Sequence, residues 1–378
     1  MMKSIREADI EEKKVFLRLD WNVPLKSGVI LNDNRIKATL ATIEYLLSKE
    51  CKIIIGAHLG RPDGEIIPQL STKILAKRFS ELCSAKTYAT DYVIESSVKK
   101  QVENLRNKEI LILGNLRFYP EEGTNNLAFA HILASYGDVF VNDAFAVCHR
   151  AHASVEAITK FLPGYAGFLL EKEVDTLRTL TQRPRHPFML ILGGAKIKEK
   201  AKLLIKFTPI VDKIIVGGAI ANTLRYFQGY NIGNSFYEPH MGELVGQILM
   251  ATQGKMVLPV DDIRKSMLSG KFSIMDIGPQ TIAKFKTCIS KAKTIFWNGN
   301  MGHSEDKEFE TGTLEIASAI KDNHYTRIVA GGDTVGFIDS KNMTSGYSFV
   351  STGGGAALEF LAGEELPALK ALGYYSYS

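Results

Sequence analysis

Short apolar runs alternate with longer segments of helical period along the chain. The runs are KVFLRLD, KIIIGAH, EILILGN and DVFVND in the first half, and FMLILGG, KIIVGG, TIFWNG and RIVAGGD in the second. Segments such as RIKATLATIEYLLSKE and AKLLIKFTPIVD lie between them and predict amphipathic helices. Apolar runs separated by helices are typical of parallel strands buried on both faces. The pattern predicts two consecutive α/β units with right-handed crossovers.

The segment PGYAGFLLEKEVDTLRTLTQRPRHP marks the boundary between the two units. A Pro-Gly break precedes a strongly periodic helix, and a proline-rich turn follows it before the next strand. A chain of 378 residues also exceeds what one hydrophobic core usually organises. We therefore predict an N-terminal domain at 1–167, a connecting helix at 168–183 and a C-terminal domain at 184–363. A rigid connecting helix suits two domains that move relative to each other.

Composition narrows the class of protein. The chain is 45% hydrophobic and 23% charged, which disfavours disordered and fibrous proteins. Its net charge of +5 is small, and no block of like charges suggests a nucleic-acid tail or a polybasic membrane anchor. The N-terminus has no apolar signal region, and no segment reaches the length of a membrane span. Cys51, Cys83, Cys148 and Cys288 are widely spaced, which favours reduced thiols in a cytoplasmic protein over disulfides or zinc.

Basic and short polar side chains follow the predicted strands of the first half. They are Asp20, Asn22, His58, Arg61, Arg117, His149, Arg150 and His152, with Arg35 after the turn-like LNDN. Ligands of open α/β sheets bind beyond the carboxyl ends of the strands. Because guanidinium groups pair with either phosphate or carboxylate, the set predicts a site for a small ligand that carries both. The alternative is that the arginines are solvated surface charges and that the histidines only orient neighbouring groups.

Glycines follow the strands of the second half instead. They form Gly193-Gly194, Gly217-Gly218, Asn298-Gly299, Gly331-Gly332 and Gly353-Gly354-Gly355. Glycine lets the backbone approach a ligand closely, and the start of a helix offers N–H donors to phosphate. Lys196 and Lys200 are four residues apart on the first predicted helix, where they would share one face. The pattern predicts a polyphosphate site in which Asp333 is a magnesium ligand, although each glycine pair by itself also fits a tight turn.

Neither G-x-x-x-x-G-K-[ST] nor G-x-G-x-x-G occurs in the chain. P-loop ATPases and dinucleotide-dependent oxidoreductases therefore lose support. An oxidoreductase and a catalytically silent scaffold stay open as rival hypotheses. Trp297 is expected in the core, and zinc binding by the histidines is disfavoured because no thiolates or clustered acids accompany them.

A series of motifs in order along nearly the whole chain resembles the phosphoglycerate kinase family. The motifs are RLDWNVPL, LNDNRI, HLGRP, GNLRF, FVNDAFAVCHRAHAS, AGFLLEKE, GGAKIKEK, DIGPQT, WNGNMG, FETGT, GGDT and STGGGAALEFLAG. The resemblance implies two Rossmann-like three-layer αβα domains whose parallel sheets face each other across a cleft. It also implies reversible transfer between ATP plus 3-phosphoglycerate and ADP plus 1,3-bisphosphoglycerate, in glycolysis and gluconeogenesis, by a monomer. The segment at about 364–378 is similar to a family tail that packs back on the first domain.

The resemblance also implies roles for individual residues. The acid substrate would be bound by Asp20, Asn22, Arg35, His58, Leu59, Gly60, Arg61, Arg117 and Arg150. Magnesium nucleotide would be bound by Gly193, Lys200, Gly218, Asn298, Glu305, Gly331, Gly332, Asp333, Thr334 and Gly354. Arg35 and Lys196 would lie at the transferring phosphoryl group. The acceptor in the family reaction is a carboxylate with a pKa of about 4, so no general base is needed. Closure about a hinge would bring the two ligands together.

Some positions depart from the family pattern. Asn300 replaces a usual proline, His303 and Ser304 replace an apolar pair, and Ala330 replaces a glycine. Glu199 lies where aspartate is common. Most of these positions belong to the base and ribose side of the implied nucleotide site. The departures leave nucleotide preference open, and the roles of His149 and His152 are open as well.

Overall fold

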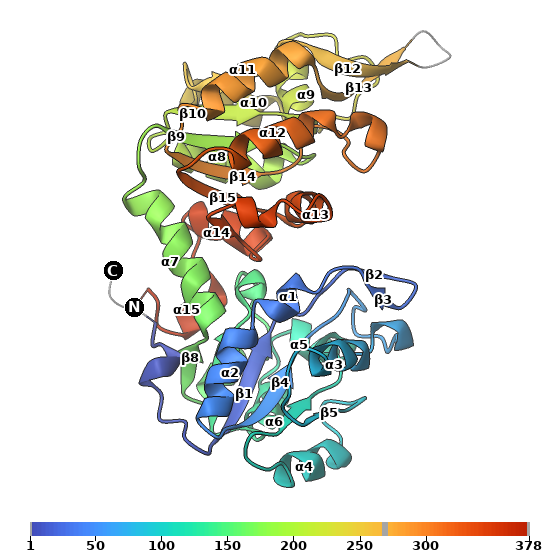
Figure 1. Cartoon of the computed structure of the whole chain (residues 1–378), viewed down its shortest axis with the longest axis vertical. Coiled ribbons are helices and arrows are strands. Elements are labelled where there is room, and N and C mark those ends of the chain that lie inside the picture. Colours follow the sequence, from blue (N-terminus) through green and yellow to red (C-terminus); the bar gives the residue numbers. More distant parts are fainter. Residues whose placement is uncertain (1, 267–270, 376–378) are drawn as a thin grey trace. The chain divides into compact units, whose positions relative to one another are not determined.

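The structure is a computed structural model that describes residues 2–266 and 271–375. The chain divides into two compact units (Figure 1), unit 1 with Met1–Asp175 and Glu365–Ser378, and unit 2 with Thr176–Glu364. The division falls inside helix α7 (Phe168–Gln182), which contributes residues to both units. In the tail, the N–H of Ala368 donates to the carbonyl oxygen of Cys148 at 3.2 Å in unit 1. Residues 376–378 of the predicted tail lie outside the described residues.

Unit 1 is built on a six-stranded parallel sheet. Its strands, in spatial order, are β5 (Thr87–Ala89), β6 (Ile110–Ile112), β4 (Lys52–Gly56), β1 (Lys14–Leu19), β7 (Val139–Asp143) and β8 (Gly164–Ala166). A short hairpin joins β2 (Leu25–Lys26) to β3 (Val29–Ile30). The helices are α1 (Asn34–Lys37), α2 (Leu40–Ser48), α3 (Lys73–Ser80), α4 (Ser96–Glu103), α5 (Pro120–Gly123), α6 (Leu127–Ala134) and α15 (Pro367–Ala371).

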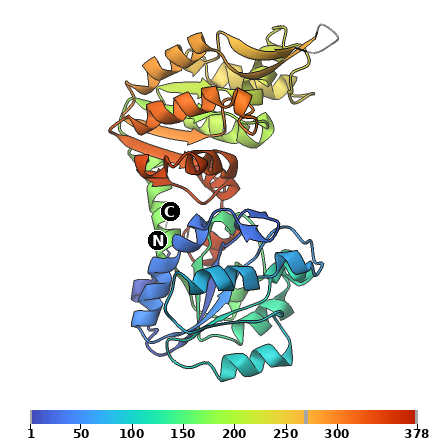
Figure 2. The same cartoon turned by 45° about the vertical axis from the view of Figure 1, so that its right-hand side comes forward.

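Both faces of this sheet are buried. Val15 and Leu17 of β1 point into a core that contains Ile43 of α2 and Phe79 of α3. Phe16, between them, lies on the opposite face and its ring meets the ring of Phe140 of β7 with 6.4 Å between centroids. Successive residues of a strand face opposite sides, so helices must cover the sheet on both sides. Figures 1 and 2 show this layering.

The predicted helix RIKATLATIEYLLSKE is divided into α1 and α2. Buried Thr39 lies between them, where its hydroxyl donates to the carbonyl oxygen of Ile36 at 2.8 Å and accepts the indole N–H of Trp21 at 3.0 Å. A threonine hydroxyl that bonds back to the preceding turn competes with the helical hydrogen bonds and bends the helix. The break separates α1, which carries Arg35, from α2.

Unit 2 has the same architecture. Its parallel sheet contains, in spatial order, β11 (Met256–Val257), β10 (Lys213–Val216), β9 (Phe188–Leu192), β14 (Thr294–Asn298), β15 (Thr326–Ala330) and β16 (Phe349–Val350). The helices are α8 (Ile197–Phe207), α9 (Gly218–Phe227), α10 (Gly242–Ala251), α11 (Pro279–Ile289), α12 (Thr311–Lys321), α13 (Gly332–Ser340) and α14 (Gly355–Leu361). An antiparallel hairpin pairs β12 (Asp262–Ser266) with β13 (Phe272–Ile277).

The strands of unit 2 are apolar because their side chains pack against helices in a hydrophobic core. Ile191 of β9 and Trp297 of β14 pack with Phe285 of α11 and Ile316 of α12 on one face of the sheet. The predicted core position of Trp297 is confirmed, since it is fully buried. The predicted α/β class with two parallel sheets is also confirmed.

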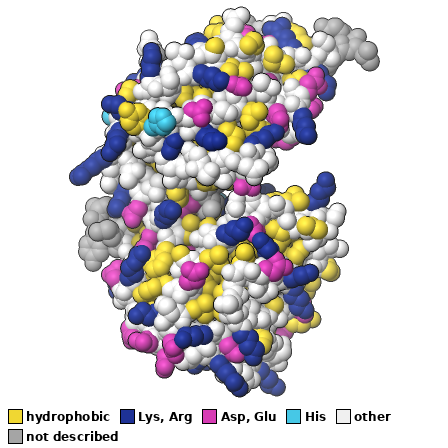
Figure 3. All heavy atoms as spheres, viewed as in Figure 1, with side chains coloured by type: hydrophobic (Ala, Val, Ile, Leu, Met, Phe, Trp, Pro, Cys, Tyr) yellow, Lys and Arg dark blue, Asp and Glu magenta, His cyan; other side chains and the backbone are white. Residues whose placement is uncertain are grey.

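Three further properties concern the cysteines, the helices and the charged surface. All four cysteines are free thiols, and burial raises the pKa of Cys51 to about 12. Among the described residues, no helix is both long and apolar enough to cross a membrane. Lysine, arginine, aspartate and glutamate side chains are interspersed over the face shown in Figure 3.

Candidate functional site

The topology of each sheet indicates where a ligand binds. In unit 1 the strand order reverses between β1 and β7, and in unit 2 it reverses between β9 and β14. Ligands of open α/β sheets bind beyond the carboxyl ends of the strands at such a reversal. The predicted site residues follow these strands and their neighbours, so each unit carries one candidate site.

In unit 1, Asp20 follows β1 and is 8% exposed. Its carboxylate accepts a hydrogen bond from Nη1 of Arg35 in α1, and its Oδ1 accepts the N–H of Asn22 at 3.2 Å. Oδ1 of Asn22 accepts the N–H of Gly60 at 2.8 Å, which joins the loop after β1 to the loop after β4. The predicted polar residues therefore connect two adjacent strand ends and hold the Arg35 guanidinium.

His58, at the end of β4, is buried beside these groups. Its Nδ1 lies 3.8 Å from Oδ1 of Asp20 and 3.4 Å from Nη2 of Arg18. Burial lowers the pKa of His58 well below its ordinary value of 6.5, and Arg18 and Arg117 act in the same direction. His58 is therefore a neutral hydrogen-bonding group at neutral pH rather than a cation.

The remaining arginines differ in exposure. Nη1 of Arg117 donates to the carbonyl oxygen of Gly60 at 3.0 Å. Burial lowers the pKa of Arg117 to about 10, with contributions from Arg18 and Arg150, so Arg117 stays charged at neutral pH. Arg150 and Arg61 are exposed, the latter in the loop after β4. The site thus has an inner set of fixed cations and outer arginines on exposed loop positions.

His149 and His152 follow β7. Nε of Arg150 donates to Nε2 of His149 at 3.3 Å, which fits the hypothesis that a histidine orients an arginine. Burial lowers the pKa of His149 to about 4 and that of His152 to about 3, and neighbouring arginines add to both shifts. Both rings are therefore neutral at neutral pH.

Unit 2 contains a cavity of about 730 Å³ at the predicted glycines. The cavity is lined by residues of the loops after β9, β14 and β15, by the start of α9 and by the hairpin of β12 and β13. Helices α8, α9, α13 and α14 begin at or beside it. Their first N–H groups lack partners within the helix and attract anions, so the cavity offers main-chain donors to phosphates.

At two positions beside this cavity, the backbone geometry favours glycine over any residue with a side chain. A Cβ at Gly193 would lie 2.1 Å from the carbonyl oxygen of Asn300, because the loops after β9 and β14 run side by side. Gly331 precedes α13 with φ of 101°, a conformation that favours glycine. Gly218 and Gly332 are the first residues of α9 and α13, and Gly354 precedes α14.

The two predicted lysines have different environments. Lys196 precedes α8 with an extended backbone, is exposed, and donates to Glu199 at 2.8 Å. Lys200 is 7% exposed, and its Nζ donates to the carbonyl oxygens of Gly193 and, at 3.2 Å, of Asn298. The expectation that both share one face of a helix is wrong, because α8 begins only at Ile197. Burial lowers the pKa of Lys200 to about 8, against the opposing effect of Glu199 and Asp333.

Asp333 and Thr334 are in the first turn of α13. Asp333 is exposed at the cavity wall, while the Thr334 hydroxyl accepts the N–H of Gly299 at 2.8 Å. Nδ2 of Asn298 donates to the carbonyl oxygen of Ala330 at 2.9 Å, which joins β14 to β15. Within residues 2–266 and 271–375, no cluster of three or more His, Cys, Asp or Glu side chains suits a metal ion. Magnesium nevertheless fits here, because it usually needs one or two carboxylates and takes its other ligands from nucleotide phosphates and water.

Three of the residues that depart from the family pattern lie in the segment after β14, and two of these contact each other. Nδ2 of Asn300 donates to Oγ of Ser304 at 2.6 Å, and Nδ1 of His303 lies 3.3 Å from Oε2 of Glu305. Asn300, His303 and Glu305 line the cavity. Of the replaced positions, Asn300, His303 and Glu199 therefore lie in the wall of the cavity.

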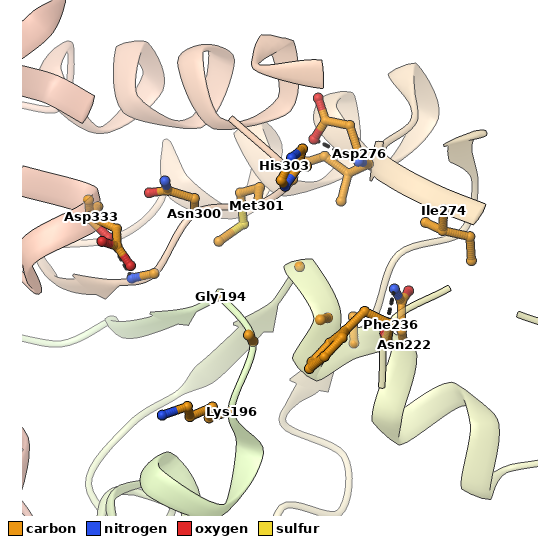
Figure 4. A pocket seen from close by; sticks show the side chains of 18 of the residues that line it. Gly194, Lys196, Asn222, Phe236, Ile274, Asp276, Asn300, Met301, His303 and Asp333 are labelled. Atoms are coloured by element: carbon orange, nitrogen blue, oxygen red, sulfur yellow. Dashed lines mark hydrogen bonds between the residues drawn. The ribbon is translucent and has the colours of Figure 1, made fainter. Parts of the chain in front are cut away.

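Sequence reasoning missed the wall of the cavity distant from Asp333. There Phe236 and Ile274 line the cavity, as Figure 4 shows, and Phe236 is 63% exposed. Its backbone is held by Nδ2 of Asn222, which donates to the carbonyl oxygen of Phe236 at 3.3 Å. These apolar groups suit a flat ring such as a nucleotide base. No sequence signal marked Phe236, because it lies in an irregular segment.

Three buried polar residues of unit 1 were also missed. They are Arg18, Glu122 and Ser154, each fully buried. Arg18 gave the clearest signal, since a charged residue inside an apolar strand needs a partner. Its partners come from segments far along the chain, which the sequence alone does not bring together.

Comparison with known proteins identifies the family. Residues 5–364 match the family model described as phosphoglycerate kinase. The phosphoglycerate kinase of Coprothermobacter proteolyticus is 41% identical, with 98% of each chain covered, and that of Campylobacter lari is 40% identical over 98% of this chain and 97% of the relative. The solved structure of the Coxiella burnetii enzyme matches with a TM-score of 0.84 and 34% identity over 99% of each chain. The solved structure of the Pyrococcus horikoshii enzyme matches with a TM-score of 0.88 and 31% identity over 98% of each chain.

Two α/β units, one with a cationic side-chain site and the other with a glycine-lined cavity, fit a phosphotransferase, and these relatives give its acceptor as a carboxyl group. More particularly, the chain belongs to the phosphoglycerate kinase family. The resemblance seen in the sequence motifs and the prediction of an enzyme are confirmed.

Proposed function

We propose that the protein transfers a phosphoryl group reversibly between ATP and 3-phosphoglycerate, giving ADP and 1,3-bisphosphoglycerate, as a step of glycolysis and gluconeogenesis. Unit 1 binds the acid and unit 2 binds magnesium nucleotide. The observation that carries this proposal is the convergence of Arg35, His58 and Arg117 around Asp20 at the strand ends of unit 1. Membership of the family supplies the reaction.

The acid site suits a ligand with two anionic ends. Arg35 and Arg117 offer charged donors, while Arg61 and Arg150 are exposed and long enough to reach out to phosphate. Neutral His58 adds a hydrogen bond without adding charge. We assign Asp20, Asn22, Leu59 and Gly60 to the loops that shape this site. The N–H of Gly60 donates to Asn22, which joins the loop after β4 to the loop after β1. The N–H of Leu59 donates to Asn115, which joins the loop after β4 to the loop after β6.

In the nucleotide site, phosphates receive main-chain N–H donors and the Lys200 ammonium. Magnesium would be held by Asp333 together with nucleotide phosphates, and when bound it would neutralise part of the diphosphate charge. Phe236 and Ile274 would contact the base, and Glu305 and the Asn300 loop would contact the ribose side. The glycines keep the main chain close enough for these contacts.

The chemistry needs alignment and charge compensation rather than proton removal. A carboxylate acceptor is ionised at neutral pH, because its pKa is about 4. The loose transition state of phosphoryl transfer spreads negative charge over the equatorial oxygens. Arg35 and Lys196 would supply positive charge from the acid and nucleotide sides. Since the two ligands bind different units, we propose that a hinge closure, in which α7 takes part, unites them and excludes water.

We also propose that the protein works as a monomer in the cytoplasm. Four free cysteines, two of them fully buried, support a reducing compartment. Analytical ultracentrifugation at the protein concentration used in the activity assay would test whether the protein is a monomer. We expect a single species of about 41.8 kDa. A stable dimer would contradict it.

A steady-state assay tests the proposed function. ATP, magnesium and 3-phosphoglycerate are supplied, and formation of the acyl phosphate is coupled to NADH oxidation. We expect turnover that requires all three, and comparison of ATP with GTP measures the nucleotide preference that the sequence leaves open. Absence of turnover with either nucleotide would contradict the proposal and favour a catalytically silent protein.

A further inference from the structure

Below the acid site of unit 1 lies a carboxylate without contact with solvent. Glu122 of α5 (Figure 1) is fully buried, and its two oxygens accept the N–H of Ser154 at 2.9 Å and the Ser154 hydroxyl at 2.6 Å. A buried carboxylate is costly unless it is paired and hydrogen-bonded. The buried carboxylate of Glu122 is therefore expected to have a cation nearby.

That cation is Arg18 of β1. Its Nε donates to Oγ of Ser154 at 2.8 Å, and its Nη2 lies 3.9 Å from Oε1 of Glu122. The Ser154 hydroxyl thus accepts from Arg18 and donates to Glu122. Burial lowers the pKa of Arg18, and the charges of Glu122 and Asp20 oppose that shift. Arg18 is fully buried, and its orientation depends on these contacts and on the hydrogen bond from its Nη1 to the carbonyl oxygen of Leu19.

The guanidinium nitrogen that lies near Glu122 also lies near residues of the acid site. Nη2 of Arg18 lies 3.4 Å from Nδ1 of His58, whose ring lies 3.8 Å from the Asp20 carboxylate that holds Arg35. Glu122 is also 3.7 Å from Nδ1 of His152. A continuous series of polar contacts therefore runs from Glu122 to Arg35. Removing the carboxylate would leave the Arg18 charge poorly compensated inside the protein.

We propose that Glu122, acting through Ser154, is a positioning residue that holds Arg18 beneath His58 and Asp20 and so fixes the acid site. The inference rests on the proposed function, since it assumes that unit 1 binds phosphoglycerate. Glu122 has no exposed surface with which to touch the ligand, and it acts only through the residues above it.

The test compares Glu122→Gln with Glu121→Gln, which changes an exposed neighbour on the same helix. Glu122→Gln should raise KM for 3-phosphoglycerate about 10-fold, the scale of one charged hydrogen bond. KM for ATP should stay within about twofold, because unit 2 carries the nucleotide site. Ser154→Ala should raise KM for 3-phosphoglycerate with the same selectivity. The double variant should be no worse than Glu122→Gln alone, because both changes interrupt one path.

The outcomes separate the hypotheses. A shift of both KM values together, or additive effects of the two substitutions, would overturn the positioning role in favour of a purely structural one. A KM for 3-phosphoglycerate equal to that of Glu121→Gln would overturn it directly. If Glu122→Gln does not fold, the KM values of Ser154→Ala test the positioning role instead, because this substitution removes only one hydroxyl. An unchanged KM for 3-phosphoglycerate in Ser154→Ala would then overturn the role. An inactive unmutated enzyme would overturn the proposed function and this inference together.

Discussion

The two units share one architecture, but the candidate site of unit 1 consists mainly of side-chain groups and that of unit 2 mainly of main-chain groups. Unit 1 uses side chains held by buried partners, as in the pairing of Asp20 with Arg35 and of Arg18 with Ser154. Unit 2 presents main-chain groups at glycines. Asp333 and Lys196 are exposed, and buried Lys200 is held by main-chain carbonyl oxygens. Fixed charges suit a small rigid acid, because they specify its two ends. Main-chain N–H donors suit a polyphosphate, because its many oxygens accept similar hydrogen bonds.

The five positions that depart from the family pattern all lie in unit 2. Asn300 and His303 lie in the wall of the cavity, where Asn300 donates to Ser304 and His303 lies beside Glu305. We expect a site built from main-chain groups to tolerate such changes as long as the glycines remain. We expect a site built from paired charges to tolerate fewer changes, because each charge stabilises its neighbour.

The largest effect is expected from Lys196→Ala. Its ammonium group is expected to act in the transition state, so kcat should fall about 100- to 1,000-fold while ADP affinity changes little. Steady-state kinetics and calorimetric titration of ADP measure the two quantities. Lys198→Ala, which removes an exposed lysine in the first turn of α8, is the control. Near-normal kcat in Lys196→Ala would exclude the catalytic role.

A glycine substitution tests the main-chain character of unit 2. Gly193→Ala places a Cβ 2.1 Å from the Asn300 carbonyl oxygen, so the loops after β9 and β14 must separate. Overpacking of this kind costs about 1–3 kcal/mol, and ADP affinity should fall about 10- to 100-fold. Gly336→Ala in α13 meets no atom within 4 Å and should bind ADP normally. Equal affinities for the two variants would contradict a main-chain site.

Arg61→Ala tests the outer part of the acid site. We expect KM for 3-phosphoglycerate to rise about 10-fold, as one charged hydrogen bond is lost, with KM for ATP unchanged. Arg106→Ala, an exposed arginine elsewhere in unit 1, is the matched control. An unchanged KM for 3-phosphoglycerate would remove Arg61 from the site.

The smallest effect is a pH dependence of nucleotide binding. Burial lowers the pKa of Lys200 to about 8 from an ordinary 10.5. Phosphate binding should raise this pKa, so ADP binding above about pH 8 takes up a proton and weakens by up to about tenfold per pH unit. For the unliganded protein the sign is opposite: between these pKa values the unfolded chain binds more protons, so the contribution of Lys200 to stability increases with pH.

Titration calorimetry in buffers of different ionisation enthalpy measures the proton uptake. Lys202→Ala, which removes an exposed lysine of the same helix, should keep it. Lys200→Met should abolish it. Uptake that persists in Lys200→Met would assign the proton to another group.

The strands and site loops were predictable because their signals are local. Apolar runs such as FMLILGG mark buried strands, and residues at their ends were expected at one edge of a sheet. Thr39 was not recognised as a break, since its effect depends on the Trp21 indole. The environment of Lys200 depends on carbonyl oxygens of two strands, and the partnership of Arg18 with Glu122 joins positions 104 residues apart (122 − 18). Such contacts arise only when the sheet assembles.

Hydrogen exchange with each ligand alone tests most directly the claim that one unit binds the acid and the other the nucleotide. We predict that 3-phosphoglycerate slows exchange around 20–22, 58–61 and 115–118, and that magnesium ADP slows it around 193–197, 298–302 and 331–334. Protection of the second set by 3-phosphoglycerate, or of the first by ADP, would contradict the division of the two sites.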